Sequence, residues 1–244
     1  MNNTHIKSIV GMAGLVAAML MSPVFAAGHE AVASVKGPST NVAWTADLVR
    51  FVAQGDKNRG AQLHQDLFCV SCHGNAGIAP SGNWPSLAGQ RAEYTFKMLK
   101  DYKDGKRKGS HAAEIMTAEG QMVSDQDMAD LAQFYASFDL PKLPDGVSFD
   151  PAAADKISYL IRRGDGKRLL APCQSCHGSD GAGAVTDTPA LAGQTPEYFI
   201  KTMQDYKTGV RKNDVYSRMR LIAQVLTDEE IELLAHYYAG MTAK

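Results

Sequence analysis

The segment Cys69-Val-Ser-Cys72-His73-Gly74 returns 104 residues later as Cys173-Gln-Ser-Cys176-His177-Gly178. The sequence around it repeats at the same offset, because Pro85-Ser-Leu-Ala-Gly-Gln90 corresponds to Pro189-Ala-Leu-Ala-Gly-Gln194. Self-similarity at a constant spacing indicates a tandem duplication of one domain of roughly a hundred residues. The repeated Cys-x-x-Cys-His segment therefore decides both the domain organisation and the chemistry.

The first 26 residues have the features of a secretory signal. Lys7 precedes an apolar run of 13 residues from Ile9 to Met21, and Val24-Phe25-Ala26 ends the segment. A helix needs about 20 apolar residues to cross a bilayer, so the run is too short for a permanent anchor. We expect cleavage after about Ala26, a periplasmic protein, and a mature chain without a transmembrane segment that is compatible with peripheral membrane association.

The remaining chain is expected to hold two domains, at 27–138 and 151–244, joined by a linker at 139–150. The linker contains Pro141 and Pro144, which block helix continuation and favour extended backbone. The net charge of −1 among 244 residues, with 45% apolar residues, indicates an ordinary globular protein. It gives no electrostatic signature of nucleic-acid binding.

The local patterns predict an all-α fold. Ser124 with Asp127, and Thr227 with Glu230, are spaced as capping boxes before runs with helical apolar periodicity. The apolar faces of these two helices are Met128, Leu131 and Tyr135 in the first copy and Ile231, Leu234 and Tyr238 in the second. Further helices are expected from Ala46 to Val52 and from near Tyr94 and Tyr198.

Cys-x-x-Cys-His is the arrangement for covalent attachment of a c-type haem. On a helical turn, residues i and i+3 face the same way, so both sulfurs can form thioethers while the histidine at i+4 points a ring nitrogen at the iron. The sequence thus predicts two covalently bound haem c groups. The attachment cysteines are Cys69, Cys72, Cys173 and Cys176, and the axial histidines are His73 and His177.

Three other uses of the cysteines fit the sequence less well. A four-thiolate zinc site would have to bring the pairs together across a hundred residues and would leave both histidines idle. A thioredoxin-like dithiol is expected in an α/β domain without the trailing histidine. Disulfides between residues i and i+3 close very small loops and stabilise little. Haem attachment is favoured over all three.

Haem iron in class I cytochromes c takes a methionine as its sixth ligand. After the second copy loses one residue, the offset becomes 103, and Met116 coincides with Met219. Each lies eight residues before the Ser or Thr that caps the last helix. We therefore predict these two methionines as axial ligands. Met122 is the rival in the first copy, His111 is a weaker one, and a plain core role is the alternative.

A ligating imidazole keeps its orientation by donating its other N–H to an acceptor. Pro85 and Pro189 each follow their histidine by twelve residues and offer a carbonyl on a rigid backbone. We predict that these carbonyls accept from His73 and His177, although both prolines could simply shape a turn.

In the order and spacing of these motifs, the chain resembles the dihaem class I cytochromes c of the cytochrome c4 type. The resemblance covers about Gly60 to Gly240 and rests on the paired haem motifs, the Leu-Ala-Gly-Gln elements and the methionine before a capped last helix. It implies two cytochrome c folds facing each other across a pseudo-twofold axis. It also implies a carrier that exchanges electrons with protein donors and acceptors, such as a membrane-bound terminal oxidase.

Histidine and methionine ligation leaves no open coordination position, which favours a carrier over an enzyme. The alternative is an electron-accepting subunit of a periplasmic dehydrogenase for thiosulfate, sulfide or an alcohol, and a dihaem peroxidase is less favoured. A basic stretch of the chain is either a docking surface for an acidic partner or a plain solvated face. It consists of Lys97, Lys100, Lys103, Lys106, Arg107 and Lys108.

Overall fold

The computed structural model describes residues 42–142, 151–184 and 186–241. The expected signal segment 1–26, with its cleavage site after Ala26, and linker residues 143–150 lie outside the described residues. None of the helices in the described part is long and apolar enough to cross a bilayer.

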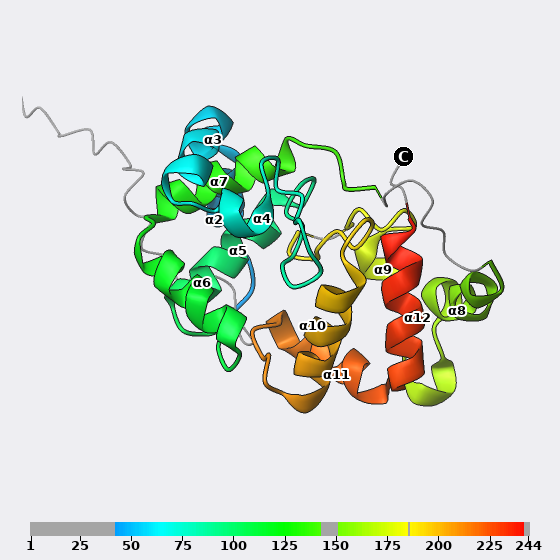
Figure 1. The fold of residues 1–244 in the computed structure, drawn as a ribbon. Helices are drawn as coiled ribbons and strands as arrows, with labels where there is room; N and C mark the ends of the chain where they lie inside the picture. The colour runs from blue at the N-terminus through cyan, green and yellow to red at the C-terminus, as the bar shows by residue number, and fades with distance from the viewer. Residues whose placement is uncertain (1–41, 143–150, 185, 242–244) are drawn as a thin grey trace, which may run out of the picture.

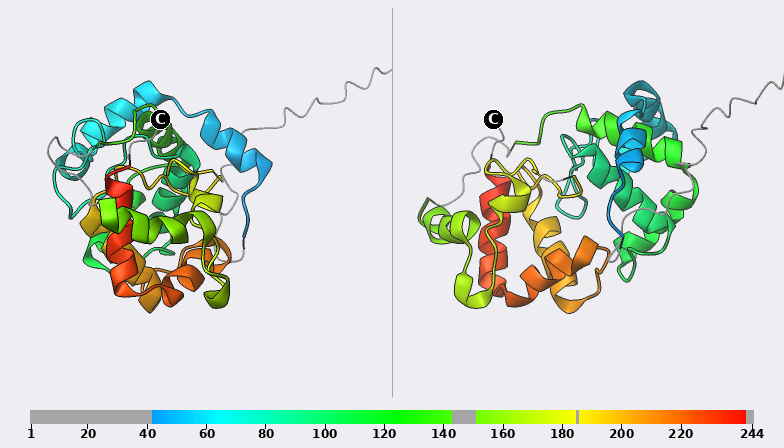
Figure 2. Two further views of the ribbon diagram at one scale, coloured as in Figure 1. Left: turned by 90° about the vertical axis from the view of Figure 1, so that its right-hand side faces the viewer. Right: turned by 180° about the vertical axis from the view of Figure 1, so that it is seen from behind.

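Two helical halves lie side by side, as Figure 1 shows and Figure 2 confirms from the side and from behind. The first half consists of α2 (Ala46–Ala53), α3 (Lys57–Asp66), α4 (Val70–His73), α5 (Ala92–Lys103), α6 (His111–Gln121) and α7 (Asp125–Ala136). The second consists of α8 (Pro151–Arg163), η1 (Gly166–Arg168), α9 (Gln174–His177), α10 (Pro196–Thr208), η2 (Val215–Ser217), α11 (Arg218–Val225) and α12 (Asp228–Ala239). The described residues form no β-strand, and Asp165 and Leu170 form an isolated bridge. The predicted all-α fold is confirmed.

The last helix of each half begins at a capping box, as the spacing predicts. Ser124 and Thr227 accept backbone N–H groups of the first turn, and the carboxylates of Asp127 and Glu230 accept the N–H groups of the two capping residues. The expected apolar faces are buried in both helices. These helices form the centre of each core, α7 against α3 and α5, and α12 against α10 and α8.

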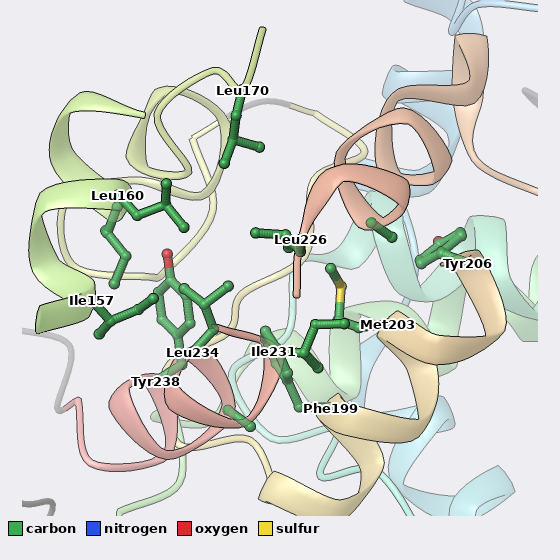
Figure 3. Packing of buried hydrophobic residues seen from close by; sticks show 13 residues of the cluster. Ile157, Leu160, Leu170, Phe199, Met203, Tyr206, Leu226, Ile231, Leu234 and Tyr238 are labelled. Atoms are coloured by element: carbon green, nitrogen blue, oxygen red, sulfur yellow. The ribbon is translucent and has the colours of Figure 1, made fainter. Parts of the chain in front are cut away.

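The two cores are separate clusters of apolar side chains. In the second half, Ile231, Leu234 and Tyr238 of α12 meet Ile157 of α8 and Phe199 of α10, as Figure 3 shows. The corresponding residues of α7 pack with α2 and α5 in the first half. Each half thus buries its own core, which agrees with the expected duplication.

Polar contacts join the halves in a nearly symmetric way. The amide of Gln90 donates to the carbonyl of Ala190 at 3.1 Å and accepts from its N–H at 2.8 Å. Gln194 makes the same pair of bonds to Ser86, at 3.0 and 2.9 Å. The loops that follow α4 and α9 are thereby placed against each other in the middle of the molecule (Figure 1). This reciprocal contact gives the halves a pseudo-twofold relation.

The connecting segment runs past the glycines of both Leu-Ala-Gly-Gln elements. Gly89 and Gly193 have φ angles of +67° and +71°, which favour glycine. A Cβ at Gly89 would lie 2.6 Å from the backbone nitrogen of Leu140, and one at Gly193 would lie 1.9 Å from the carbonyl oxygen of Pro141. A side chain at either position would therefore push the start of the connector away.

Candidate functional site

Each Cys-x-x-Cys-His segment folds into one short helical turn, α4 in the first half and α9 in the second. Cys69 and Cys173 are the N-cap residues of these turns, and the backbone N–H groups of His73 and His177 donate to their carbonyls at 3.0 Å. The two cysteines of a motif therefore lie one helical turn apart, as attachment to one macrocycle requires. All four cysteines are free of disulfides and partly accessible.

The two motif histidines are buried and held by the predicted proline carbonyls. Nδ1 of His73 lies 2.9 Å from the Pro85 carbonyl oxygen, and Nδ1 of His177 lies 2.9 Å from that of Pro189. A carbonyl can only accept, so Nδ1 carries the proton and Nε2 is the nitrogen left to bind iron. Burial lowers the pKa of His73 and lowers that of His177 to about 4. Both imidazoles are thus neutral, the form that ligates a metal.

The predicted methionines lie on corresponding helices. Met116 is on α6, packed against a small cluster that includes Met98 and Tyr102, and Met219 is at the start of α11, packed against the core of the second half. Both side chains are partly buried. Their ligation of iron stays a prediction.

The rivals in the first copy face solvent. Met122, the C-cap residue that follows α6, has 59% of its surface exposed, and the His111 side chain is 88% exposed beside Glu114. Neither has the partly buried setting of Met116.

The alternative zinc site finds no support in the described residues. They contain no group of three or more His, Cys, Asp or Glu side chains that could hold a metal ion. The two cysteine pairs belong to separate halves of the molecule, as Figure 1 shows by the positions of α4 and α9. A shared four-thiolate zinc site is therefore not formed.

A second pair of reciprocal contacts links the loop after α5 to α10 and the loop after α10 to α5. Arg107 donates to the hydroxyl of Tyr198 at 3.0 Å, and Arg211 donates to the hydroxyl of Tyr94 at 3.0 Å. Each guanidinium also lies over a tyrosine ring of its own half. Burial raises the pKa of Tyr198, but the two arginines lower it to about 8. The guanidinium groups of Arg107 and Arg211 thus give this contact region an excess of positive charge.

This excess provides a test of whether the residues fit haem. Arg211 is buried and Arg107 partly buried, and neither forms an ion pair with a carboxylate of the described residues. Burying an uncompensated cation costs free energy unless an anion pairs with it. The propionates of a haem would supply such anions, and either guanidinium could pair with one. With the cysteine pairs and oriented histidines, the donor set fits one haem in each half.

The basic stretch around Arg107 is used within the molecule. Lys97 forms a buried ion pair with Asp101, and Lys100 pairs with Asp125 at 3.0 Å. Lys103 donates to the carbonyl of Val123. Lys106 lies 3.3 Å from a carboxylate oxygen of Asp104. The idea of a free basic docking face is therefore wrong for most of these side chains. Helical spacing suggested a common face but could not show which neighbours cover it.

Two features of the sites were not predicted from the sequence. Gln90 and Gln194 are evident there only as parts of the repeat, although they bond directly beside the prolines that hold the ligand histidines. His64 is completely buried next to the first haem motif. The recurrence of Gln90 as Gln194 was a usable signal, whereas nothing in the sequence around His64 indicated its burial.

Comparison with known proteins agrees with this geometry. The cytochrome c family profile matches residues 58–138 and 164–241. A cytochrome c4 of Thiocapsa roseopersicina is 35% identical and covers 77% of this chain and 94% of its own length. A thiosulfate dehydrogenase electron acceptor of Stutzerimonas stutzeri is 32% identical and covers 83% of this chain and 89% of its own. The crystal structure of reduced recombinant cytochrome c4 from Pseudomonas stutzeri superposes with a TM-score of 0.66 at 31% identity, covering 77% and 99%.

Proposed function

This chain belongs to the cytochrome c family as a dihaem protein of the cytochrome c4 type, and we propose that it shuttles electrons in the periplasm between a respiratory donor and a terminal oxidase or reductase. As a member of that group it carries two covalently bound haem c groups and acts as an electron carrier. The expected leader, 1–26, supports export to the periplasm.

The residues proposed to hold the haems are those of the two repeated motifs. Cys69 and Cys72 would bind the first by thioethers, with His73 and Met116 as axial ligands. Cys173, Cys176, His177 and Met219 would do the same for the second. The haem would supply a one-electron couple, and with these histidines and methionines as ligands each iron would have no open position for a substrate.

The observation that carries the proposal is the matched pair of His–Pro contacts. In each half, a buried imidazole has one nitrogen fixed by a proline carbonyl at 2.9 Å, and the other has no hydrogen-bond partner among the residues that the structure describes. A fixed ligand changes its position little between oxidation states, which keeps the reorganisation cost of electron exchange small. The two halves share this geometry, so both haems are suited to electron exchange.

The alternative is an electron-accepting subunit of a periplasmic dehydrogenase. A relative described as a thiosulfate dehydrogenase electron acceptor matches most of this chain, and such a role leaves the haem domains unchanged and alters only the partner. Affinity isolation of the chain from its native periplasm would separate the two roles. A stoichiometric dehydrogenase would favour the subunit role, and recovery without one would favour the shuttle.

The test of the proposed function is an intact-mass measurement with a visible spectrum on the exported protein. We expect the mass of the processed chain plus two haems and a low-spin spectrum in both oxidation states. A mass without haem would contradict the proposal, and a large high-spin ferric fraction would indicate an open iron and favour a peroxidase.

A further inference from the structure

His64 is completely buried in the first half, and the second half has Arg168 at the corresponding position. It belongs to α3, whose close approach to α7 depends on Gly60, because a Cβ there would lie 2.2 Å from the carbonyl oxygen of Asp130. This approach buries the His64 ring completely, next to the rings of Phe134 and Tyr135. The imidazole therefore cannot form hydrogen bonds with solvent, and its two ring nitrogens depend on partners within the protein.

Those partners determine where the protons are. Nε2 of His64 lies 3.0 Å from the carbonyl oxygen of Gly74, and Nδ1 lies 2.8 Å from the hydroxyl of Tyr135. The carbonyl can only accept, so Nε2 carries the proton. Burial lowers the pKa of His64, which keeps the ring neutral and leaves Nδ1 as an acceptor. Tyr135 must then donate its proton to His64.

The direction of the Tyr135 proton matters because the hydroxyl also lies beside the sulfur of Cys69. Burial raises the pKa of the Cys69 thiol, and the nearby Tyr135 hydroxyl acts in the opposite direction. With the proton turned to His64, the tyrosine presents only oxygen lone pairs to that sulfur. A thioether sulfur accepts hydrogen bonds weakly, so a hydroxyl without another acceptor would turn its proton toward it.

The second half shows that situation. Tyr238 corresponds to Tyr135 and lies beside Cys173, but its buried hydroxyl has no hydrogen-bond partner among the described residues. Arg168 stands where His64 stands in the first half, and it points to Glu230 and the carbonyl of Val225 instead. The sulfur of Cys173 thus has an uncommitted hydroxyl proton beside it.

We propose that His64 is a positioning residue for the first haem, which turns the Tyr135 proton away from the Cys69 sulfur and so makes the two haem environments unequal. The inference rests on the proposed function, because it requires haem at Cys69 and Cys72. Hydrogen bonds around a haem tune its reduction potential. A hydroxyl proton facing the thioether favours the electron-rich reduced state, so its removal toward His64 lowers the potential of the first haem.

The experiment is a redox titration of the full dihaem protein, in which paramagnetic NMR follows the haem methyl signals of each half separately. We expect His64→Leu to raise the potential of the first haem and leave the second unchanged. His64→Gln, which keeps a donor and an acceptor on one planar group, should retain the wild-type value. Arg168→Gln, the change at the equivalent position, should alter neither potential. An unchanged first haem in His64→Leu, or an equal shift of both haems, would overturn the proposal.

A double-mutant cycle tests whether His64 acts through the tyrosine. In a Tyr135→Phe background, His64→Leu should cause no shift of the first haem, and a shift of undiminished size would refute the proposed route. The wild-type protein gives a measurement that needs no variant, because ¹H–¹⁵N spectra report the histidine tautomer. A proton on Nδ1 of His64 would overturn the proposal even if the variants fail to fold. A wild-type mass with fewer than two haems would instead contradict the proposed function.

Discussion

Lys97 and Lys201 occupy the same position in the two copies, and their surroundings differ greatly. Lys97 and its partner Asp101 are 2% and 0% exposed, and Asn213 of the other half bonds to both. Lys201 and Asp205 keep the same i,i+4 spacing with 58% and 21% of their side chains exposed. Both copies thus keep the lysine–aspartate pair, but the pair is buried only in the first half.

This difference predicts unequal costs of removing the lysine. Lys97→Met leaves the Asp101 carboxylate buried without its cation, which should lower the free energy of unfolding by about 3–5 kcal/mol. Lys201→Met removes an exposed pair and should cost about 0–1 kcal/mol. Urea unfolding of the two variants checks the prediction, and equal costs would show that Lys97 is not buried as the structure has it.

The axial methionines can be tested at the same scale. Met116→Leu keeps the apolar volume but removes the sulfur, so the absorption band from thioether-to-iron bonding should lose the contribution of one haem. Met219→Leu should do the same at the other haem. The control is Met122→Leu, which changes an exposed residue of the same helix end and should leave the band intact. Retention of the full band in Met116→Leu would remove that assignment.

At the scale of single elements, the caps of α7 and α12 give a prediction about pH. Burial raises the pKa of Asp127, but hydrogen bonds from Ser124 and the ion pair with Arg59 outweigh it and lower the pKa below its ordinary value. A group whose pKa is lower in the folded state stabilises the fold above its unfolded pKa, about 3.9, and loses that effect as the pH falls through its folded pKa.

Asp127→Asn should therefore cost roughly 1 kcal/mol near neutral pH, and the difference from wild type should disappear in acid. Chemical unfolding measured across this pH range checks it. Asp139→Asn is the control, since that carboxylate is exposed beyond the helix end. A cost that stays constant into acid would mean that the charge of Asp127 is not what stabilises the cap.

Elements with strong local signals could be predicted from the sequence, and those held by distant contacts could not. The capping residues and apolar faces of α7 and α12 lie within one short window, and the 46–52 helix agrees with α2. Helix α3 is polar, contains Gly60 and forms because it packs on α7, so its own sequence gives little sign of it. The same holds for the site, where the motif cysteines and histidines were evident but His64 was not.

At the scale of the whole molecule, Gln90 and Gln194 connect the two haem sites. Each bonds to the residue that follows the proline holding a ligand histidine of the other half. A chain of covalent and hydrogen bonds thus runs from His73 through Pro85 and Ser86 to Gln194, and a matching one starts at His177. The contact fixes the spacing of the two haem-binding segments as well as joining the domains.

Removing both glutamine amides should affect the interaction between the two halves more than the fold of either half. Each Gln→Ala change leaves a backbone N–H and carbonyl at the interface without partners, at a cost of about 1–3 kcal/mol. We expect Gln90→Ala with Gln194→Ala to separate the unfolding of the halves into two calorimetric transitions and to slow electron transfer between the haems after pulsed reduction of one.

The control is Gln133→Ala, because Gln133 bonds to the carbonyl of Val52 at 2.8 Å within the first half alone. That change should lower stability without altering the electron-transfer rate. If the double variant transfers electrons as fast as the control, the glutamines hold the domains together without setting the path between the haems.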